Sequence, residues 1–276
     1  MTEHPLETVV EDLAFGESVR WHDGRVWFCD WGDGEVVSVR PDGSDRTVHA
    51  TVSAGPVCVD WDARGRLLVV EGARGRLLRV DAGGGEPDVV ADLGAVSPYP
   101  WNEVVGHPSG TAFVNGIGFD MMRGAPAGPG QIALVTDDGT VREVAGDLAF
   151  PNGMALGPDG ATLLVAESHA SRITAFTVTA DGLTDRRVFA EVPGSAPDGI
   201  ALTADGSVWY ADVPNRCCRR VREGGEVLAE VALDRGGFSC AATEDGDLYV
   251  AATVWDEATF GTRRGLLLRA RGAGRT

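Results

Sequence analysis

The chain has 276 residues, of which 43% are hydrophobic, and it contains 38 glycines and 14 prolines. This length fits two ordinary domains or one large all-β domain, and the abundance of turn residues favours short strands over long helices. The formal charge of −17 at pH 7 argues against a nucleic-acid-binding protein, because a phosphate backbone requires a basic surface.

The composition also narrows the chemistry and the compartment. All 24 basic residues are arginines, which excludes Schiff-base and P-loop lysine chemistry. The cysteine count is odd and no CxxC spacing occurs, so a reducing compartment is expected rather than a disulfide framework. The N-terminal residues lack the apolar core of a signal peptide, and no apolar run is long enough to cross a membrane. We therefore expect a cytoplasmic protein without a membrane partner.

Strand-like segments recur along the chain in a regular order. After a first run at 7–15, a turn that ends in glycine and leads directly into an apolar run occurs six times. The turn glycines are Gly24, Gly65, Gly110, Gly160, Gly206 and Gly246. One apolar run precedes each turn, as in NGMALG and DGIALT, and the runs that follow alternate or cluster Val, Leu, Trp, Tyr and Phe. Internal repeats with this period are typical of β-propellers.

The repeats contain about four strand-like runs each, which predicts an all-β, six-bladed β-propeller that forms a single domain over residues 1–276. The last repeat ends after its third run, GLLLRARG, whereas ETVVEDLAF at 7–15 resembles a fourth run without a blade of its own. We therefore expect the N-terminal strand to complete the last blade and close the ring, for which a monomer is the default state.

The longest interval between two turns contains a Gly/Pro-rich insert, GFDMMRGAPAGPG at 118–130. Insertions in propeller blades lie on one face and often carry function. Phe119, Met121 and Met122 could cover a pocket there, although an ordinary long hairpin explains the insert equally well.

The first strand of each blade lines the central channel, so the residue that opens it is expected to face the axis. The six opening residues are Glu17, Val57, Asn102, Asn152, Asp198 and Phe238. Four of them carry oxygen, and two of those are carboxylates. Two carboxylates buried close together are unfavourable unless a cation or a proton neutralises them. Carboxylate and amide oxygens without His or Cys suit a hard cation, Ca²⁺ above all, with Mg²⁺, Mn²⁺ or Zn²⁺ as alternatives.

The phrases FGESVRW, YPWNEVV, NGIGFD, FPNGMALGPDGATLLVAES and APDGIALTADGSVWYADVPNR are spread over nearly the whole chain. Together they resemble the senescence marker protein (regucalcin) / gluconolactonase / luciferin-regenerating-enzyme-like family of six-bladed propellers. The resemblance implies a divalent metal held by Glu17, Asn152 and Asp198, with Asn102 as a fourth ligand or a substrate contact.

The region around Asn102 departs from the family pattern. Family members that hydrolyse sugar lactones have an Arg two residues before this Asn and an Asp directly after it, and here those positions hold Pro100 and Glu103. The departure weakens the case for a sugar lactone. We expect the substrate contacts to come from the segments around this position, and the candidates are Tyr99, Trp101, Asn102, Glu103, Phe119 and Asp120. The aromatic candidates favour a less polar substrate, although packing in the core explains them equally well.

The resemblance implies a metal-dependent hydrolase that opens a lactone, in which Asp198 is the candidate general base. Two alternatives remain: the same site could hydrolyse or rearrange another ester, a phosphoester or a specialised metabolite, or the ring could be a non-enzymatic binding scaffold. The five histidines show no paired-ligand spacing, and no GxSxG motif supports a serine nucleophile.

Overall fold

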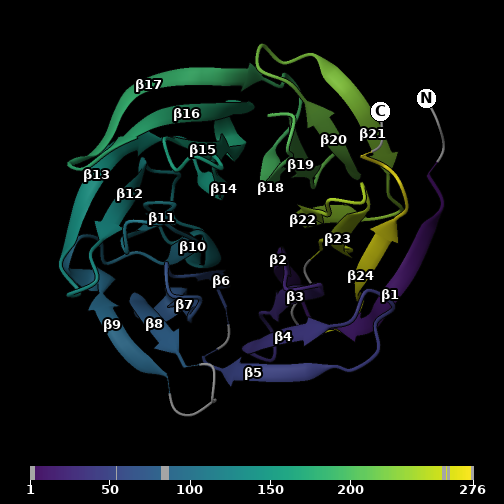
Figure 1. Ribbon diagram of the computed structural model, residues 1–276, viewed down its shortest axis with the longest axis horizontal. Coiled ribbons are helices and arrows are strands. Elements are labelled where there is room, and N and C mark those ends of the chain that lie inside the picture. The colour runs from purple at the N-terminus through teal and green to yellow at the C-terminus, as the bar shows by residue number, and fades with distance from the viewer. Residues whose placement is uncertain (1–3, 54, 82–86, 257–258, 260–261, 275–276) are drawn as a thin grey trace.

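The computed structural model describes residues 4–53, 55–81, 87–256, 259 and 262–274. Six antiparallel sheets of four strands each surround a central axis (Figure 1). In every sheet but one, the four strands follow one another in sequence, from the innermost strand to the outermost. The prediction of a six-bladed β-propeller with four strands per blade is confirmed.

The strands have the following bounds in the first three blades. Blade 1 contains β2 (Gly16–His22), β3 (Arg25–Asp30), β4 (Glu35–Val39) and β5 (Thr47–Thr51). Blade 2 contains β6 (Val57–Trp61), β7 (Leu67–Glu71), β8 (Arg76–Val80) and β9 (Asp88–Asp92). Blade 3 contains β10 (Trp101–Gly106), β11 (Ala112–Gly116), β12 (Gly130–Val135) and β13 (Val141–Leu148).

The remaining three blades follow in chain order. Blade 4 contains β14 (Pro151–Leu156), β15 (Thr162–Glu167), β16 (Arg172–Thr179) and β17 (Gly182–Glu191). Blade 5 contains β18 (Pro197–Leu202), β19 (Val208–Asp212), β20 (Cys217–Val221) and β21 (Val227–Ala232). Blade 6 contains β22 (Gly236–Ala242), β23 (Leu248–Thr253), β24 (Gly265–Ala270) and β1 (Leu6–Leu13).

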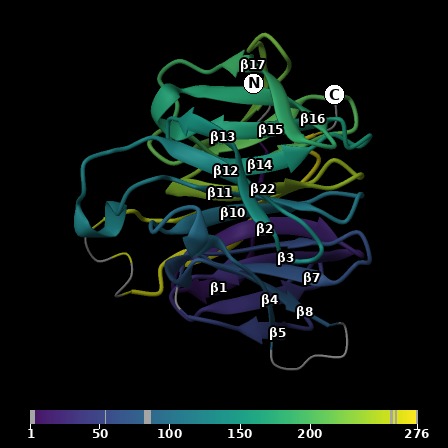
Figure 2. The ribbon, with the colours of Figure 1, turned by 90° about the vertical axis from the view of Figure 1, so that its left-hand side faces the viewer.

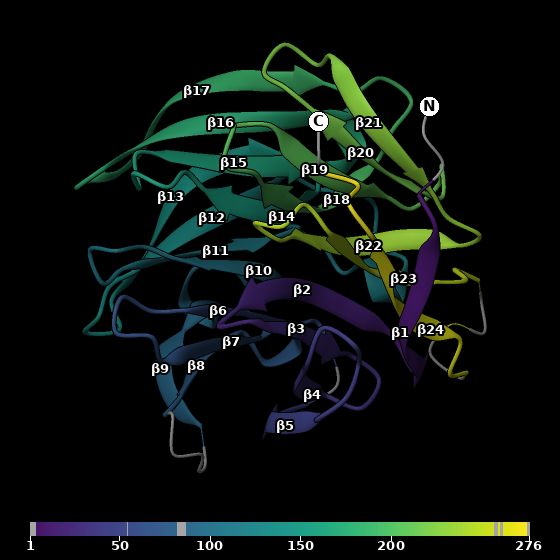
Figure 3. The same cartoon turned by 45° about the vertical axis from the view of Figure 1, so that its right-hand side comes forward.

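Blade 6 is built from both ends of the chain. The strand β1 pairs antiparallel with β24, from Leu6 opposite Ala270 to Leu13 opposite Gly265 (Figure 3). The ring is thereby closed by hydrogen bonds between segments more than 250 residues apart, as expected from the unpaired run at 7–15.

The turn between the first two strands of each blade requires glycine. All six turn glycines of the repeat have a positive φ, between 69° and 93°, which L side chains rarely adopt. These turns place the hairpins at one face of the ring and the first residues of the inner strands at the other, so the opening residues gather at a single face.

The hydrophobic core is divided among the interfaces between neighbouring blades. Each of six clusters combines residues from two adjacent sheets, so that, for example, Leu68 and Val70 of blade 2 pack with Val104 and Val114 of blade 3. Each blade is therefore stabilised by both of its neighbours, and ring closure completes the last interface.

Among the described residues, four short 3₁₀ helices occupy connections, namely η1 (Gly72–Arg74), η2 (Leu93–Ala95), η3 (Met121–Arg123) and η4 (Ser168–Ala170). The helix η3 belongs to the Gly/Pro-rich insert, which stands out from one face of the ring in Figure 2. Met121 lines the cavity at that face, whereas the side chain of Met122 lies outside the described structure. Within the described residues, no helix has the length and apolar character needed to cross a membrane.

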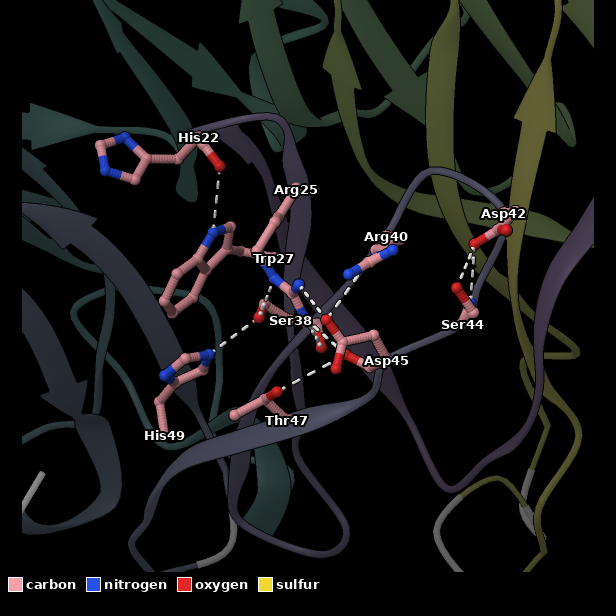
Figure 4. A network of polar contacts seen from close by, with 10 residues as sticks. All are labelled: His22, Arg25, Trp27, Ser38, Arg40, Asp42, Ser44, Asp45, Thr47 and His49. Atoms are coloured by element: carbon pink, nitrogen blue, oxygen red, sulfur yellow. Dashed lines mark hydrogen bonds and ion pairs between the residues drawn. The ribbon is translucent and has the colours of Figure 1, made fainter.

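Blade 1 shows how polar side chains join the strands of one sheet (Figure 4). Arg25 of β3 donates from Nε to the Oγ of Ser38, 2.8 Å away, and its Nη1 lies 2.9 Å from Oδ2 of Asp45. The same Ser38 hydroxyl lies 2.8 Å from Nε2 of His49, whose ring stacks on Trp27. The His49 imidazole therefore has a structural role in the sheet.

Candidate metal and substrate site

The inner strands are irregular at the point where they face the axis. In five of the six blades the pairing between the first and second strands contains one extra residue on the inner strand, at Glu17, Asn102, Asn152, Asp198 and Phe238 or directly beside them. The pairing of β6 with β7 in blade 2 has no such irregularity, and its opening residue is Val57. A β-bulge redirects side chains locally. The bulges therefore coincide with the strands whose opening residues reach the cavity.

A cavity of about 920 Å³ lies at this end of the channel. The four oxygen-bearing residues predicted to face the axis, Glu17, Asn102, Asn152 and Asp198, all line it. Three of them are nearly buried, with 8% exposure each for Glu17, Asn102 and Asp198. The structure therefore brings together the four residues that the sequence analysis proposed as metal ligands.

The inner strands approach one another closely because small residues follow the opening positions. A Cβ atom on Gly153 would lie 2.5 Å from the backbone oxygen of Asp198, and one on Gly199 would lie 2.6 Å from the Cα of Ser239. Neither distance is possible for a real side chain. These two glycines therefore allow blades 4, 5 and 6 to converge at the axis, beside Asn152 and Asp198.

Burial and neighbouring negative charges disfavour the ionised forms of the two axial carboxyl groups, Glu17 and Asp198. Burial, and next the charge of Glu103, raises the pKa of Glu17 to about 8, although the backbone N–H of Ser18 donates to its Oε2 at 3.0 Å. Burial, and then the charges of Glu17 and Glu103, also raises the pKa of Asp198 well above its ordinary value. The Oδ1 atom of Asp198 is buried and accepts no hydrogen bond from the protein. Such an atom requires a proton, a water molecule or a cation.

The two axial amides are held by hydrogen bonds that leave acceptor capacity. The Nδ2 of Asn102 donates to Oδ1 of Asn152 at 2.9 Å, and that oxygen retains a second lone pair. The fully buried Asn115 holds the neighbouring backbone, because its Nδ2 donates to the carbonyl oxygen of Asn152 at 2.6 Å and its Oδ1 accepts from the N–H of Glu103 at 3.2 Å. Asn115 thus joins blades 3 and 4 beside the site, a role that its sequence context did not indicate.

A set of hard oxygen donors that includes an orphaned carboxylate oxygen fits a divalent cation. The described residues contain no cluster of three or more His, Cys, Asp or Glu side chains suited to a metal. The axial donors differ from such a cluster because two of the four are amides. The cation would neutralise Glu17 and Asp198 and would give the Oδ1 of Asp198 a partner.

Glu103 lies beneath the cavity and does not line it. It is 4% exposed, and its Oε1 lies 2.8 Å from Nη2 of Arg20, whose side chain is 15% exposed. Burial disfavours the charged form of Arg20, but the nearby carboxylates of Glu103 and Asp60 outweigh it and raise the pKa of this guanidinium. Asp60, whose pKa burial raises to about 6, accepts from the N–H of Gly106 at 2.8 Å. We call Arg20, Asp60 and Glu103 the subaxial cluster.

The other predicted substrate contacts occupy three different environments. Trp101 borders the cavity but is fully buried in the core between blades 2 and 3. Tyr99 and Phe119 line a separate, smaller hollow beside the Gly/Pro-rich insert. Asp120 caps η3 by accepting from the N–H of Arg123 at 3.2 Å. The ring of Phe119 also lies 5.8 Å from that of Phe150 and 6.3 Å from that of His169, two residues that line the main cavity.

Several cavity residues were not among the predicted contacts. His169, at the start of η4, lines the cavity with its ring 4.5 Å from that of Phe150, and burial lowers its pKa. Four aromatic rings on the opposite side, those of Phe15, Trp31, Phe238 and Trp255, also line the cavity. Except for Phe238, which the sequence analysis placed among the opening residues, these residues lie in strand connections, where sequence periodicity carries no signal.

A second group of buried carboxylates stands at the ends of the second strands. Asp30, Glu71, Glu167 and Asp212 are each at most 3% exposed, and they accept hydrogen bonds from the loop that leads into their own blade. Asp212, for example, lies 2.8 Å from Nδ2 of Asn215 and 3.3 Å from Nη1 of Arg219. We call this group the strand-end carboxylates. The five cysteines are free and buried, so none forms a disulfide.

Comparison of the sequence and the fold with known proteins identifies the family of this chain. The sequence profile of the SMP-30/Gluconolactonase/LRE-like region matches residues 15–254. Pentonolactonase XacC from Haloferax volcanii is 27% identical over 210 residues, which cover 73% of this chain and 68% of that protein. A calcium-binding regucalcin from Agrobacterium tumefaciens superimposes with a TM-score of 0.78 at 21% identity, covering 98% and 95% of the two chains. A luciferin-regenerating enzyme superimposes with a TM-score of 0.81 at 17% identity, covering 98% and 96%. The chain therefore belongs to the SMP-30/gluconolactonase/LRE-like family.

Proposed function

We propose that this protein is a divalent-cation-dependent hydrolase that opens a lactone. The observation that carries the proposal is the buried Oδ1 of Asp198, which lacks a hydrogen-bond partner and lies in a cavity that Glu17, Asn102 and Asn152 also line. The relative from Haloferax volcanii is a pentonolactonase by name, which supports a lactone as the substrate. The donor set supports Ca²⁺, and Mg²⁺, Mn²⁺ and Zn²⁺ can use the same oxygens.

Glu17, Asn152 and Asp198 would hold the cation, and Asn102 would be a fourth ligand or would contact the substrate. When bound, the cation would polarise the lactone carbonyl and favour ionisation of a nearby water. The chain itself supplies the base. Asp198 lines the cavity, and its Oδ1 has no hydrogen-bond partner among the described residues, so this carboxylate has an oxygen available to accept a proton from water.

Hydrolysis of a lactone in this site needs water as its only second reactant. Asp198 removes a proton from water as the water oxygen attacks the carbonyl carbon. The ring C–O bond then breaks, and the proton held by Asp198 passes to the departing ring oxygen, which becomes a hydroxyl group. The product is an open-chain hydroxy acid, and Asp198 returns to its ionised state. The axial amides take no part in proton transfer and position the reacting groups.

The proposal is tested by metal analysis of protein purified without a chelator, followed by lactone and simple ester assays. We expect about one equivalent of a divalent cation, turnover that EDTA abolishes, and recovery on addition of Ca²⁺ or one of the other three cations. Protein that contains no metal, binds none of the four, and shows no chelator-sensitive turnover would overturn the proposal and would favour a binding scaffold.

A further inference from the structure

One wall of the main cavity is a continuous aromatic surface. Phe15 is central to it, since its ring centroid lies 4.8 Å from that of Phe238, 5.2 Å from that of Trp31 and 5.7 Å from that of Trp255. The rings of Phe238 and Trp255 are 5.5 Å apart. We call these four residues the aromatic wall. It is assembled at the junction of blades 6 and 1, where the chain leaves β1 and β3 and where β22 and β23 lie.

The burial of the aromatic wall increases from the mouth of the cavity inward. Trp255 is 49% exposed, whereas Phe238 is 5% and Phe15 2% exposed. The polar atom of Trp31 is already used, because its Nε1 donates to the carbonyl oxygen of Val57 at 2.7 Å. The two phenylalanines have no polar atoms. The wall therefore offers carbon surface to a ligand along its inner part.

The opposite side of the cavity is also largely apolar, with Ile117, Met121 and Phe150 among its residues. Among the polar side chains that line the cavity, those of Ser168 and Arg235 already have protein partners. Ser168 donates from Oγ to the carbonyl oxygen of Pro197 at 2.7 Å. Arg235 donates twice to Asp234, at 2.7 and 2.8 Å, and once to the carbonyl oxygen of Arg264.

A polyhydroxylated substrate would leave the hydroxyl groups that face the aromatic wall without hydrogen-bond partners. Each buried polar group that loses its hydrogen bond to water and gains none costs about 1–3 kcal/mol. The axial oxygens would serve one edge of the substrate only. Each CH₂ group of a substrate that packs on the aromatic wall, instead of remaining in water, contributes roughly 0.8 kcal/mol to binding. Both effects favour a substrate that is apolar away from its reacting ester.

We infer that the substrate is a lactone with an apolar substituent, alkyl or aromatic, and that this substituent packs on the aromatic wall while the ring ester faces the axial oxygens. The inference rests on the proposed lactonase function and specifies its substrate class. A volume of about 920 Å³ accommodates a ligand much larger than an unsubstituted lactone ring. Trp255, which is exposed at the mouth, would contact the outer part of the substituent.

The test compares kcat/KM, with the activating cation present, for δ-valerolactone, δ-decalactone, dihydrocoumarin and D-glucono-1,5-lactone. We expect δ-decalactone and dihydrocoumarin to exceed both the unsubstituted and the sugar lactone by about tenfold or more. A preference for the sugar lactone would overturn this inference and leave the proposed function standing. Absence of turnover with all four substrates would overturn this inference, and together with absence of cation binding it would overturn the proposed function as well.

Two variants separate the aromatic wall from general effects on folding. Trp255→Ala, at an exposed position, is expected to lower kcat/KM for δ-decalactone by about tenfold and to change that for δ-valerolactone by less than about threefold. Phe238→Ala is expected to show the same pattern with a larger loss. Val89→Ala, in the outer strand β9 and 57% exposed, is the matched control and is expected to change neither value. Equal losses on both lactones in Trp255→Ala would contradict the role of the wall.

Discussion

The axial carboxyl groups and the strand-end carboxylates are all buried but are stabilised in opposite ways. Each strand-end carboxylate accepts hydrogen bonds from backbone N–H groups or nearby side chains, so its charge is compensated by the protein. Asp198 has a buried oxygen without any such partner, and its pKa is raised. By contrast, hydrogen bonds from Arg172, Ala149 and Thr174 outweigh burial and lower the pKa of Glu167. Burial alone therefore does not identify a functional carboxylate, whereas burial without compensation does.

A matched pair of substitutions in blade 5 sharpens this comparison most. Asp198→Asn removes the proposed base and one cation ligand, and we expect kcat/KM for the preferred lactone to fall by at least about a hundredfold. The free energy of unfolding of the metal-free variant is expected to stay equal or to rise, because an uncompensated buried charge is lost. Enzyme assays and chemical denaturation in EDTA measure the two effects. Full activity in Asp198→Asn would exclude it as the base.

Asp212→Asn, at the end of the neighbouring strand, is expected to have the reverse effect. The change weakens the contacts to Asn215 and Arg219, so the free energy of unfolding should fall by about 2 kcal/mol. The side chain of Asp212 does not line the cavity, so kcat/KM of the folded variant should remain within about threefold of the parent. Glu11→Gln, an exposed position in β1, serves as the control for loss of an acidic charge. A stable but inactive Asp212→Asn would contradict the division between the two groups.

The sequence predicted the fold and the four axial oxygens because both depend on periodic features. The turn glycines recur in every blade, and the opening residues hold the same position relative to them. The bulges were not predictable in this way, since an extra residue on one strand leaves the apolar pattern of the run intact. For the same reason Glu103 was expected to contact the substrate, whereas the structure places it in an ion pair with Arg20. Within the aromatic wall, the repeat pattern identified Phe238 alone, as an opening residue. Phe15, Trp31 and Trp255 lie in strand connections, as His169 does, and the folded ring brings them to the same cavity.

The two groups of carboxylates should also differ in how they link stability to pH. The pKa of Glu17 is raised to about 8 in the folded protein, above its ordinary value of 4.5, so the folded state retains a proton that the unfolded chain releases as pH rises. Burial acts in the same direction on Asp60, whose pKa is raised to about 6. The free energy of unfolding of the metal-free protein should therefore decrease by at least about 1 kcal/mol between pH 5 and pH 8.

Denaturant titrations at several pH values, in EDTA and in excess Ca²⁺, measure this linkage. The cation should remove most of the decrease, and Glu17→Gln should reduce it in EDTA. The lowered pKa of Glu167 has the opposite sign, but its contribution is lost only as pH falls below about 4.5, outside the range tested. Stability that rises from pH 5 to pH 8 in EDTA would show that the axial carboxyl groups are compensated in a way that the structure does not contain.

The smallest expected effect concerns the subaxial cluster, which belongs to neither group. Glu103 is buried and paired, as the strand-end carboxylates are, yet its charge raises the pKa of both Glu17 and Asp198. Glu103→Gln removes that charge and leaves the partly buried Arg20 with Asp60 as its nearby carboxylate. The positive charge of Arg20 is then less compensated beneath the axial oxygens, so the affinity for Ca²⁺ should fall by about three- to tenfold.

Calorimetric titration of the metal-free variant with Ca²⁺ measures this change. Glu35→Gln, which breaks the ion pair of Glu35 with Arg46 in blade 1, is the matched control and should leave the affinity unchanged. Because Glu103 does not line the cavity, the effect of Glu103→Gln on activity should also be about the same for every lactone tested. If Glu103→Gln instead altered the preference among lactones and left Ca²⁺ affinity intact, Glu103 would act as a substrate contact, as the sequence predicted, and the ion pair with Arg20 would have to open during catalysis.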